Sequence, residues 1–222
     1  MKKVFFICMI IFNSQFFLQG VNASEEVFSD IYETGYWFSG ESYSGDGSDL
    51  RETEVIRREL PQLLREYEIK VMIDAACGDL NWIKTIDLPI EKYIGVDIVE
   101  KLIKNNTVLY GNNNREFLRI DISQDILPYS DIILCRDCLT HYPLKKAKDI
   151  ILRFKESGAK YLLVSTYPKT IKNNDLGVTG YHSRPLNMER EPFDFPVPLK
   201  LIDEHSKHKK YLGLWLLKDI EV

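Results

Sequence analysis

Short apolar runs, several of them ending at an acidic residue, recur through the middle of the chain. Residues 71–73 form the first run, which ends at Asp74, and residues 92–96 form the second, which ends at Asp97. Three further runs occupy residues 117–120, 132–134 and 161–165. A continuous apolar run of this length is typical of a strand buried on both faces of a parallel sheet. The pattern therefore predicts five strands of such a sheet.

Apolar residues at helical spacing lie between some of these runs. Between 144 and 154 they fall three or four positions apart, and so they do between 50 and 67, where Pro61 marks a turn or kink. Strands alternating with helices predict a doubly wound α/β sheet with ligands at the carboxyl ends of its strands. Residues 199–203 and 211–217, separated by a polar stretch, predict an antiparallel hairpin on the sheet edge.

The turn after the first strand reads D-A-A-C-G-D-L and carries little side-chain bulk. A ligand can approach such a backbone closely, and Gly78 can take a positive φ if the turn requires it. Residues 81–86 predict a short helix whose amino end faces this turn and favours an anionic group there. Asp97, at the tip of the second strand, suits the two hydroxyls of a ribose. Capping of the helix that begins near Val99 is an alternative role, which does not exclude the first.

Composition narrows the class of protein. The chain has 222 residues, of which 45% are hydrophobic and 28% charged, with a formal net charge of -4. Such a chain forms one well-buried globular domain, and its acidic balance lacks the broad basic face that nucleic acid binding needs. Cys135 and Cys138 form a C-x-x-C, but no second cysteine pair or spaced histidine pair accompanies them. We therefore predict buried thiols rather than a metal site.

Residues 1–23 have the layout of a signal peptide or membrane anchor, because Lys2 and Lys3 precede an apolar stretch and Ala23 offers a cleavage position. A buried N-terminal helix or a misassigned start codon is the alternative. The first reading predicts an exported protein, or one anchored to a membrane only through this segment, and the second a cytoplasmic one. The three cysteines beyond the segment are an odd number, which fits a disulfide framework poorly and so disfavours export.

Residues 24–222 are predicted to form one domain in four parts. An N-terminal lid and helix occupy 24–69, and a ligand-binding core occupies 70–167. An irregular, proline-rich segment follows at 168–198 and a closing hairpin at 199–222. Glycines interleaved with aromatic residues in the first part indicate an ordered loop that closes over a ligand. A surface loop whose aromatic side chains pack on the domain is the alternative.

Strand ends reading D-A-A-C-G-D, V-D and I-D-I, followed by a closing hairpin, resemble those of the class I S-adenosylmethionine-dependent methyltransferases. The segments I-L-C-R-D-C-L-T-H and Y-L-L-V-S-T further resemble one bacterial branch of that superfamily. The resemblance covers about Lys70 to Leu217. It implies a Rossmann-like α/β fold with a mostly parallel seven-stranded sheet and an antiparallel C-terminal hairpin. It also implies S-adenosylmethionine as cofactor and methyl transfer as the activity.

The resemblance further implies which residues hold the cofactor. Asp97 would bind the ribose hydroxyls, and Cys135 and Arg136 would line the floor of the site. The remaining positions are those for the methionine portion, Asp74, Ala76 and Gly78, and those for the adenine, Asp121 and Ile122. Carboxylates and backbone dipoles with little bulk between them meet the physical needs of a sulfonium ligand.

Methyl transfer from a sulfonium depends mainly on alignment of the nucleophile with the methyl group. A proton acceptor is needed only for a weakly acidic nucleophile such as a hydroxyl, and Asp137 and His141 are then the candidates, although a structural role for His141 stays open. For each candidate substrate contact, a position in a solvated loop is the alternative. The candidates, which lie mostly in the two irregular segments, are Tyr43, Trp82, His182, Arg184 and Asn187.

The expected acceptor is a small molecule or a glycan. Two other functions remain open. A nicotinamide-dependent oxidoreductase would also place an acid on the second strand, but the turn lacks the first and last glycines of G-x-G-x-x-G. A non-catalytic nucleoside-binding or exported binding module with the same fold is the third hypothesis.

Overall fold

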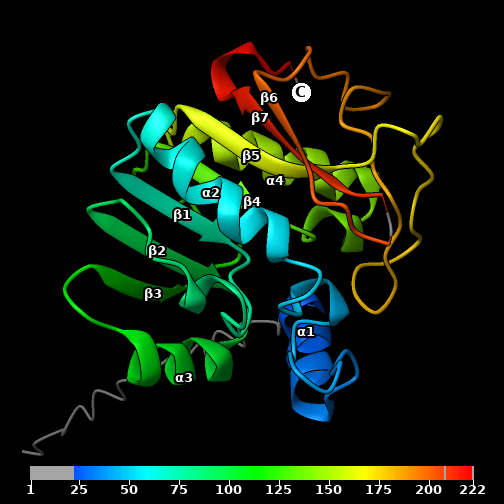
Figure 1. The fold of residues 1–222 in the computed structure, drawn as a ribbon. Helices are drawn as coiled ribbons and strands as arrows, with labels where there is room; N and C mark the ends of the chain where they lie inside the picture. The colour runs from blue at the N-terminus through cyan, green and yellow to red at the C-terminus, as the bar shows by residue number, and fades with distance from the viewer. Residues whose placement is uncertain (1–22, 208, 222) are drawn as a thin grey trace, which may run out of the picture.

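The computed structural model describes residues 23–207 and 209–221, and within them seven strands form one sheet of order β3-β2-β1-β4-β5-β7-β6. The strands are β1 Val71–Ala75, β2 Lys92–Asp97, β3 Arg115–Arg119, β4 Ile132–Cys135, β5 Tyr161–Thr166, β6 Lys200–Asp203 and β7 Tyr211–Leu216. The first five are mutually parallel, and β7 runs antiparallel to both β5 and β6. The predicted mostly parallel seven-stranded sheet is confirmed (Figure 1).

Helices cover both faces of the sheet. Four α-helices lie in the described residues: α1 Ala23–Thr34, α2 Glu54–Glu66, α3 Glu100–Tyr110 and α4 Leu144–Glu156. The apolar sides of α2 and α3 pack on one face, while α4 packs on the other (Figure 1). Neighbouring strand residues alternate between the two cores, as Ile132 and Ile133 do, because side chains of a strand point to opposite faces.

Three local features differ from the predictions. The 81–86 segment forms only a 3-10 turn, Ile83–Thr85, because Leu80 has φ +58° and the amide of Asn81 donates to the Asp79 carboxylate. In the hairpin, β7 lies inside the sheet and only β6 forms the edge. Residues 23–34 form α1, a helix that the sequence pattern does not predict, because Ile31 is its buried apolar residue and its apolar periodicity is weak.

The irregular segment 168–198 packs on the same face as α4, through Leu186, Met188, Phe193 and Phe195. Of the expected leader, 1–23, only Ala23 falls within the described residues, and it begins α1. Among the helices of residues 23–207 and 209–221, none combines the length and the apolar character needed to span a bilayer.

Candidate functional site

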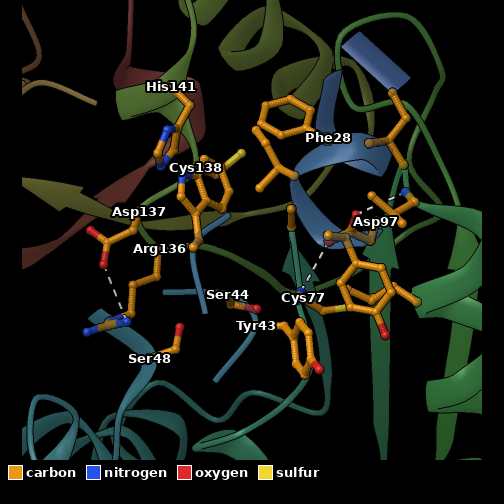
Figure 2. A pocket seen from close by; sticks show the side chains of 18 of the residues that line it. Phe28, Tyr43, Ser44, Ser48, Cys77, Asp97, Arg136, Asp137, Cys138 and His141 are labelled. Atoms are coloured by element: carbon orange, nitrogen blue, oxygen red, sulfur yellow. Dashed lines mark hydrogen bonds and ion pairs between the residues drawn. The ribbon is translucent and has the colours of Figure 1, made fainter. Parts of the chain in front are cut away.

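A cavity, here called the inner cavity, lies at the carboxyl ends of β1, β2 and β4 under α1 and the following loop. Its polar lining includes Asp74, Asp97, Arg136 and Asp137, and its apolar lining includes Phe28 and residues of the β2 to α3 connection. Figure 2 shows Asp97 and Cys77 on one side and Arg136, Asp137 and His141 on the other. Parallel strands that end at one edge bring these residues together from distant parts of the sequence.

Asp74 provides a buried carboxyl group at the tip of β1. It is 4% exposed and accepts a hydrogen bond of 2.8 Å from the hydroxyl of Tyr93. Burial raises the pKa of Asp74 to about 7, and the bond from Tyr93 offsets part of that rise. The group therefore changes its charge near neutral pH and can respond to a cationic ligand.

Asp97 spans the turn between β1 and the start of α3. Its carboxylate accepts bonds from the amide of Gly78 at 3.2 Å and from the amide of Val99 at 3.1 Å, while it also lines the inner cavity. Burial raises the pKa of Asp97, and these amide donors oppose the rise. Asp97 therefore lines the inner cavity and also accepts a bond from the residue just before α3, while its contact with ribose hydroxyls stays a prediction.

The loop of residues 35–50, here called the lid segment, is fixed to the β1 turn by Asp79. The Asp79 carboxylate accepts from the amide of Tyr43 at 2.7 Å and from the hydroxyls of Ser42 at 3.0 Å and Ser44 at 3.2 Å. Asn81 donates a second set of bonds, to the carboxylate of Glu41 at 2.6 Å and to the carbonyl of Ser48. The aromatic lid segment is thus ordered and forms part of the cavity wall.

Two of the predicted cofactor residues lie outside the inner cavity lining. Asp121 accepts bonds from the Ser123 amide and hydroxyl and from Gln124, within the turn after β3, and its neighbour Ile122 lines the cavity instead. Cys135 is fully buried in the core on the α4 face. Because β4 alternates its side chains, Cys135 points away from the face to which Leu134 contributes.

Arg136, Asp137, Glu204 and Lys210 form a compact charged network beside the cavity. The Arg136 guanidinium contacts Glu204 at 2.6 Å and Asp137 at 3.4 Å, and the ammonium of Lys210 contacts both carboxylates. Two cations face two anions. Burial acts to raise the pKa of Asp137, but Lys210 and Arg136 lower it to about 2. Asp137, a predicted base, is therefore a poor proton acceptor at neutral pH.

His141 lies above Asp137 at the wall of the inner cavity (Figure 2). Its Nδ1 lies 3.0 Å from the carbonyl of Gly180 and 3.1 Å from that of His182. Carbonyl oxygens only accept, so Nδ1 carries the proton and the Nε2 of the neutral ring keeps its lone pair. Burial lowers the pKa of His141, which favours this neutral form.

A second cavity, here called the outer cavity, adjoins the first. Trp37, Ser44, Asp137 and His141 line both, and the further lining residues of the outer cavity include Phe38, Thr140, Tyr167, Tyr181, Arg184 and Lys210. The Trp37 and His141 rings pack against each other at a tilt of 38°, with centroids 4.4 Å apart. The two cavities therefore lie side by side, with His141 and Asp137 in the lining of both.

The five candidate substrate residues lie in different places. Tyr43 and Trp82 line the inner cavity and Arg184 lines the outer one. His182 is exposed and contributes its backbone carbonyl to His141. Asn187 is buried and bonds the carbonyls of Pro168 and Thr170, so its side chain holds the irregular segment together.

Several residues that line the two cavities are not predicted by the sequence pattern. Phe28 and Tyr32 come from the unpredicted α1, and Lys210 comes from the end of a polar stretch that gave no sign of burial. Ala76 and Gly78, by contrast, line the inner cavity, and their contact with the methionine portion of a cofactor stays a prediction. Across residues 23–207 and 209–221, no cluster of three or more His, Cys, Asp and Glu side chains could hold a metal ion.

The chain matches no family model. It is 29% identical over 110 residues to a magnesium-protoporphyrin O-methyltransferase of Synechocystis sp., a match that covers 46% of each chain. The chain thus spans about half the length of this curated relative.

Two solved structures share the fold over most of this chain. Human N-acetylserotonin methyltransferase in complex with S-adenosylmethionine is 16% identical, with a TM-score of 0.60 over 87% of this chain and 59% of that one. A Burkholderia thailandensis 1,6-didemethyltoxoflavin-N1-methyltransferase with S-adenosylhomocysteine is 14% identical, with a TM-score of 0.56 over 87% of this chain and 90% of that one. With its 3-2-1-4-5-7-6 sheet and antiparallel β7, the chain has the fold of the class I S-adenosylmethionine-dependent methyltransferases.

Proposed function

We propose that this protein transfers a methyl group from S-adenosylmethionine to a hydroxyl of a small molecule or glycan. The observation that carries the proposal is that His141 lies in the lining of both cavities: acids at two strand tips line one, and aromatic and polar side chains line the other. We infer that a donor in the inner cavity reaches an acceptor in the outer cavity beside His141.

The inner cavity fits the cofactor chemically. Asp97 is suited to ribose hydroxyls, and Ile98, Val99 and Ile122 offer apolar contact to an adenine ring. Asp74 and the backbone around Gly78 are suited to the cationic methionine portion. When bound, S-adenosylmethionine supplies an electrophilic methyl group on its sulfonium.

His141 is the proposed proton acceptor. Its Nδ1 proton is held by two carbonyls, which leaves Nε2 to accept the proton of a hydroxyl. The charged network keeps Asp137 ionised, and its fixed negative charge stabilises the imidazolium that His141 becomes. The side chains that line the outer cavity orient the acceptor.

The outer cavity supports an uncharged acceptor. Two of its cations are already committed, Lys210 to Asp137 and Glu204, and Arg184 to three backbone carbonyls. An anionic acceptor would therefore displace existing partners. The aromatic faces of Trp37, Phe38 and Tyr181 suit a flat ring or the apolar face of a sugar.

The other two functions find less support. A dinucleotide-binding sheet is typically parallel with the order 3-2-1-4-5-6, whereas β7 here is antiparallel and lies between β5 and β6. A non-catalytic module would have no need of the poised Nε2 of His141 or of a second cavity beside it.

Titration calorimetry tests the cofactor. The purified protein is expected to bind S-adenosylmethionine and S-adenosylhomocysteine but not NAD, with at least tenfold weaker binding in Asp97→Asn. Asp87→Asn, at an exposed position, is the matched control. If the protein binds only NAD, or none of these three ligands, the proposal is wrong.

Transfer of a labelled methyl group tests the reaction. We expect label to pass from S-adenosylmethionine to neutral hydroxyl compounds in a panel of phenols, glycosides, carboxylic acids and sugar phosphates. His141→Gln should bind the cofactor unchanged and lose at least 99% of the transfer. A His141→Gln variant with full turnover would exclude the proposed proton acceptor.

A further inference from the structure

Residues 180–184 dock along the segment that carries His141. The amide of Gly180 donates to the carbonyl of His141 at 3.0 Å, and the amide of Arg184 donates to that of Thr140 at 3.2 Å. The same stretch supplies the carbonyls of Gly180 and His182 to the His141 ring. Backbone and ring are therefore held by one short piece of chain about forty residues away in the sequence.

The Arg184 side chain also holds these two segments together. Its guanidinium donates to the carbonyls of Leu139 at 3.0 Å and Tyr142 at 2.6 Å, which flank His141, and to that of Asn174 at 3.0 Å. A guanidinium carries donors in a rigid planar fork, so it can fix three carbonyls at once. These donors serve the backbone of the site and not a ligand.

We propose that Arg184 is a positioning residue, which sets the orientation and tautomer of His141 by holding residues 139–142 against residues 174–184. The proposal rests on the function proposed above, because it matters for turnover only if Nε2 accepts a proton. It replaces the sequence-based expectation that Arg184 contacts the substrate.

The physical reason lies in the small energy difference between the two imidazole tautomers. The carbonyls of Gly180 and His182 favour a proton on Nδ1 only while they stay within hydrogen-bond distance of it. Without Arg184, the remaining backbone bonds between the segments must maintain that distance alone. The ring then turns, and the Nε2 lone pair is no longer aimed at one place.

Nitrogen-15 NMR of histidine-labelled protein reads this tautomer directly. The chain has four histidines, and comparison with His141→Gln assigns the His141 signals. The wild-type ring is expected to be almost wholly in the Nδ1-protonated form at pH 8. Arg184→Gln should give a mixture of both tautomers, and Arg184→Lys, which keeps a donor but not the fork, an intermediate result. Exposed Arg190 of the same irregular segment supplies the control, Arg190→Gln, which should match the wild type.

Each outcome decides the proposal. If the His141 ring of the wild type is protonated on Nε2, the proposal is wrong. This measurement needs no variant, so it can be made even if Arg184→Gln does not fold. An unchanged tautomer in a folded Arg184→Gln also overturns it. Calorimetry with S-adenosylmethionine on the same samples tests the proposed function separately. A wild-type protein that does not bind S-adenosylmethionine would refute the proposed function, but the tautomer measurement would still be valid.

Discussion

Lys210 and Asp137, seventy-three residues apart, form an ion pair of the charged network, and both line the outer cavity. The side chain of Lys210 is 4% exposed, so its charge depends on these partners for compensation. Lys210→Met leaves Asp137 and Glu204 facing a single cation, Arg136. We expect a loss of about 2 to 3 kcal/mol in the free energy of unfolding, measured with urea.

Exposed Lys218 provides the comparison for that experiment. Lys218→Met should change the free energy of unfolding by less than about 0.5 kcal/mol. The double variant Lys210→Met, Asp137→Asn should recover part of the loss, because it leaves one carboxylate, Glu204, facing the one remaining cation, Arg136. No recovery would mean that the ion pair is not the source of the effect.

Asp74 makes stability depend on pH. Its folded pKa of about 7 lies above that of an unfolded aspartate, so the folded state binds the extra proton between pH 4 and 7, and stability is lost as the pH rises through this window. Asp74→Asn removes this penalty and keeps an acceptor for Tyr93. The variant's advantage over the wild type should grow from pH 4 to pH 7, then level off at roughly 4 kcal/mol.

Urea unfolding of both proteins at several pH values measures that difference. The same substitution should weaken binding of S-adenosylmethionine at pH 8, where the wild-type carboxyl group is charged. A variant advantage that is constant from pH 4 to pH 8 would contradict the raised pKa of Asp74.

Asp79 is expected to control closure of the lid segment. Asp79→Ala removes the acceptor shared by Ser42, Tyr43 and Ser44, so the lid segment should open more often. Amide hydrogen exchange in residues 35–50 should accelerate at least tenfold, and the affinity for S-adenosylmethionine should fall by a similar factor. Asp87→Ala, at an exposed position nearby, should leave both unchanged.

Gly78 couples the turn conformation to the lid segment. It has φ +57°, and a Cβ atom there would lie 2.2 Å from Oγ of Ser44, which itself bonds Asp79. Gly78→Ala therefore adds backbone strain and a clash, and we expect at least a tenfold loss of cofactor affinity. In Gly78→Ala, Ser44→Ala the contact with Oγ is removed, but a Cβ contact of 3.1 Å and the backbone strain remain, so affinity should return only in part. Full affinity in the single variant would show that Ser44 moves away freely.

The sequence carried most of the information about the sheet. Continuous apolar runs and the acids after them located β1, β2 and β4 closely, because burial on both faces excludes polar residues from such strands. The same logic placed Asp74 and Asp97 at one edge, where the structure has them. The sequence pattern predicted α1 less well, because its sequence lacks a clear apolar stripe. Its aromatic side chains line the inner cavity and contact other aromatic rings.

Only the tertiary structure decided which candidates meet. Asp121 and Asp97 follow similar apolar runs, yet one carboxylate bonds its own turn and the other lines the inner cavity. The pairing of Lys210 with Asp137, and of Arg184 with carbonyls around His141, joins segments far apart in the chain. Periodicity reports which side chains are buried against their neighbours along the chain, whereas the partner of a charge depends on how distant segments pack, which no local pattern encodes.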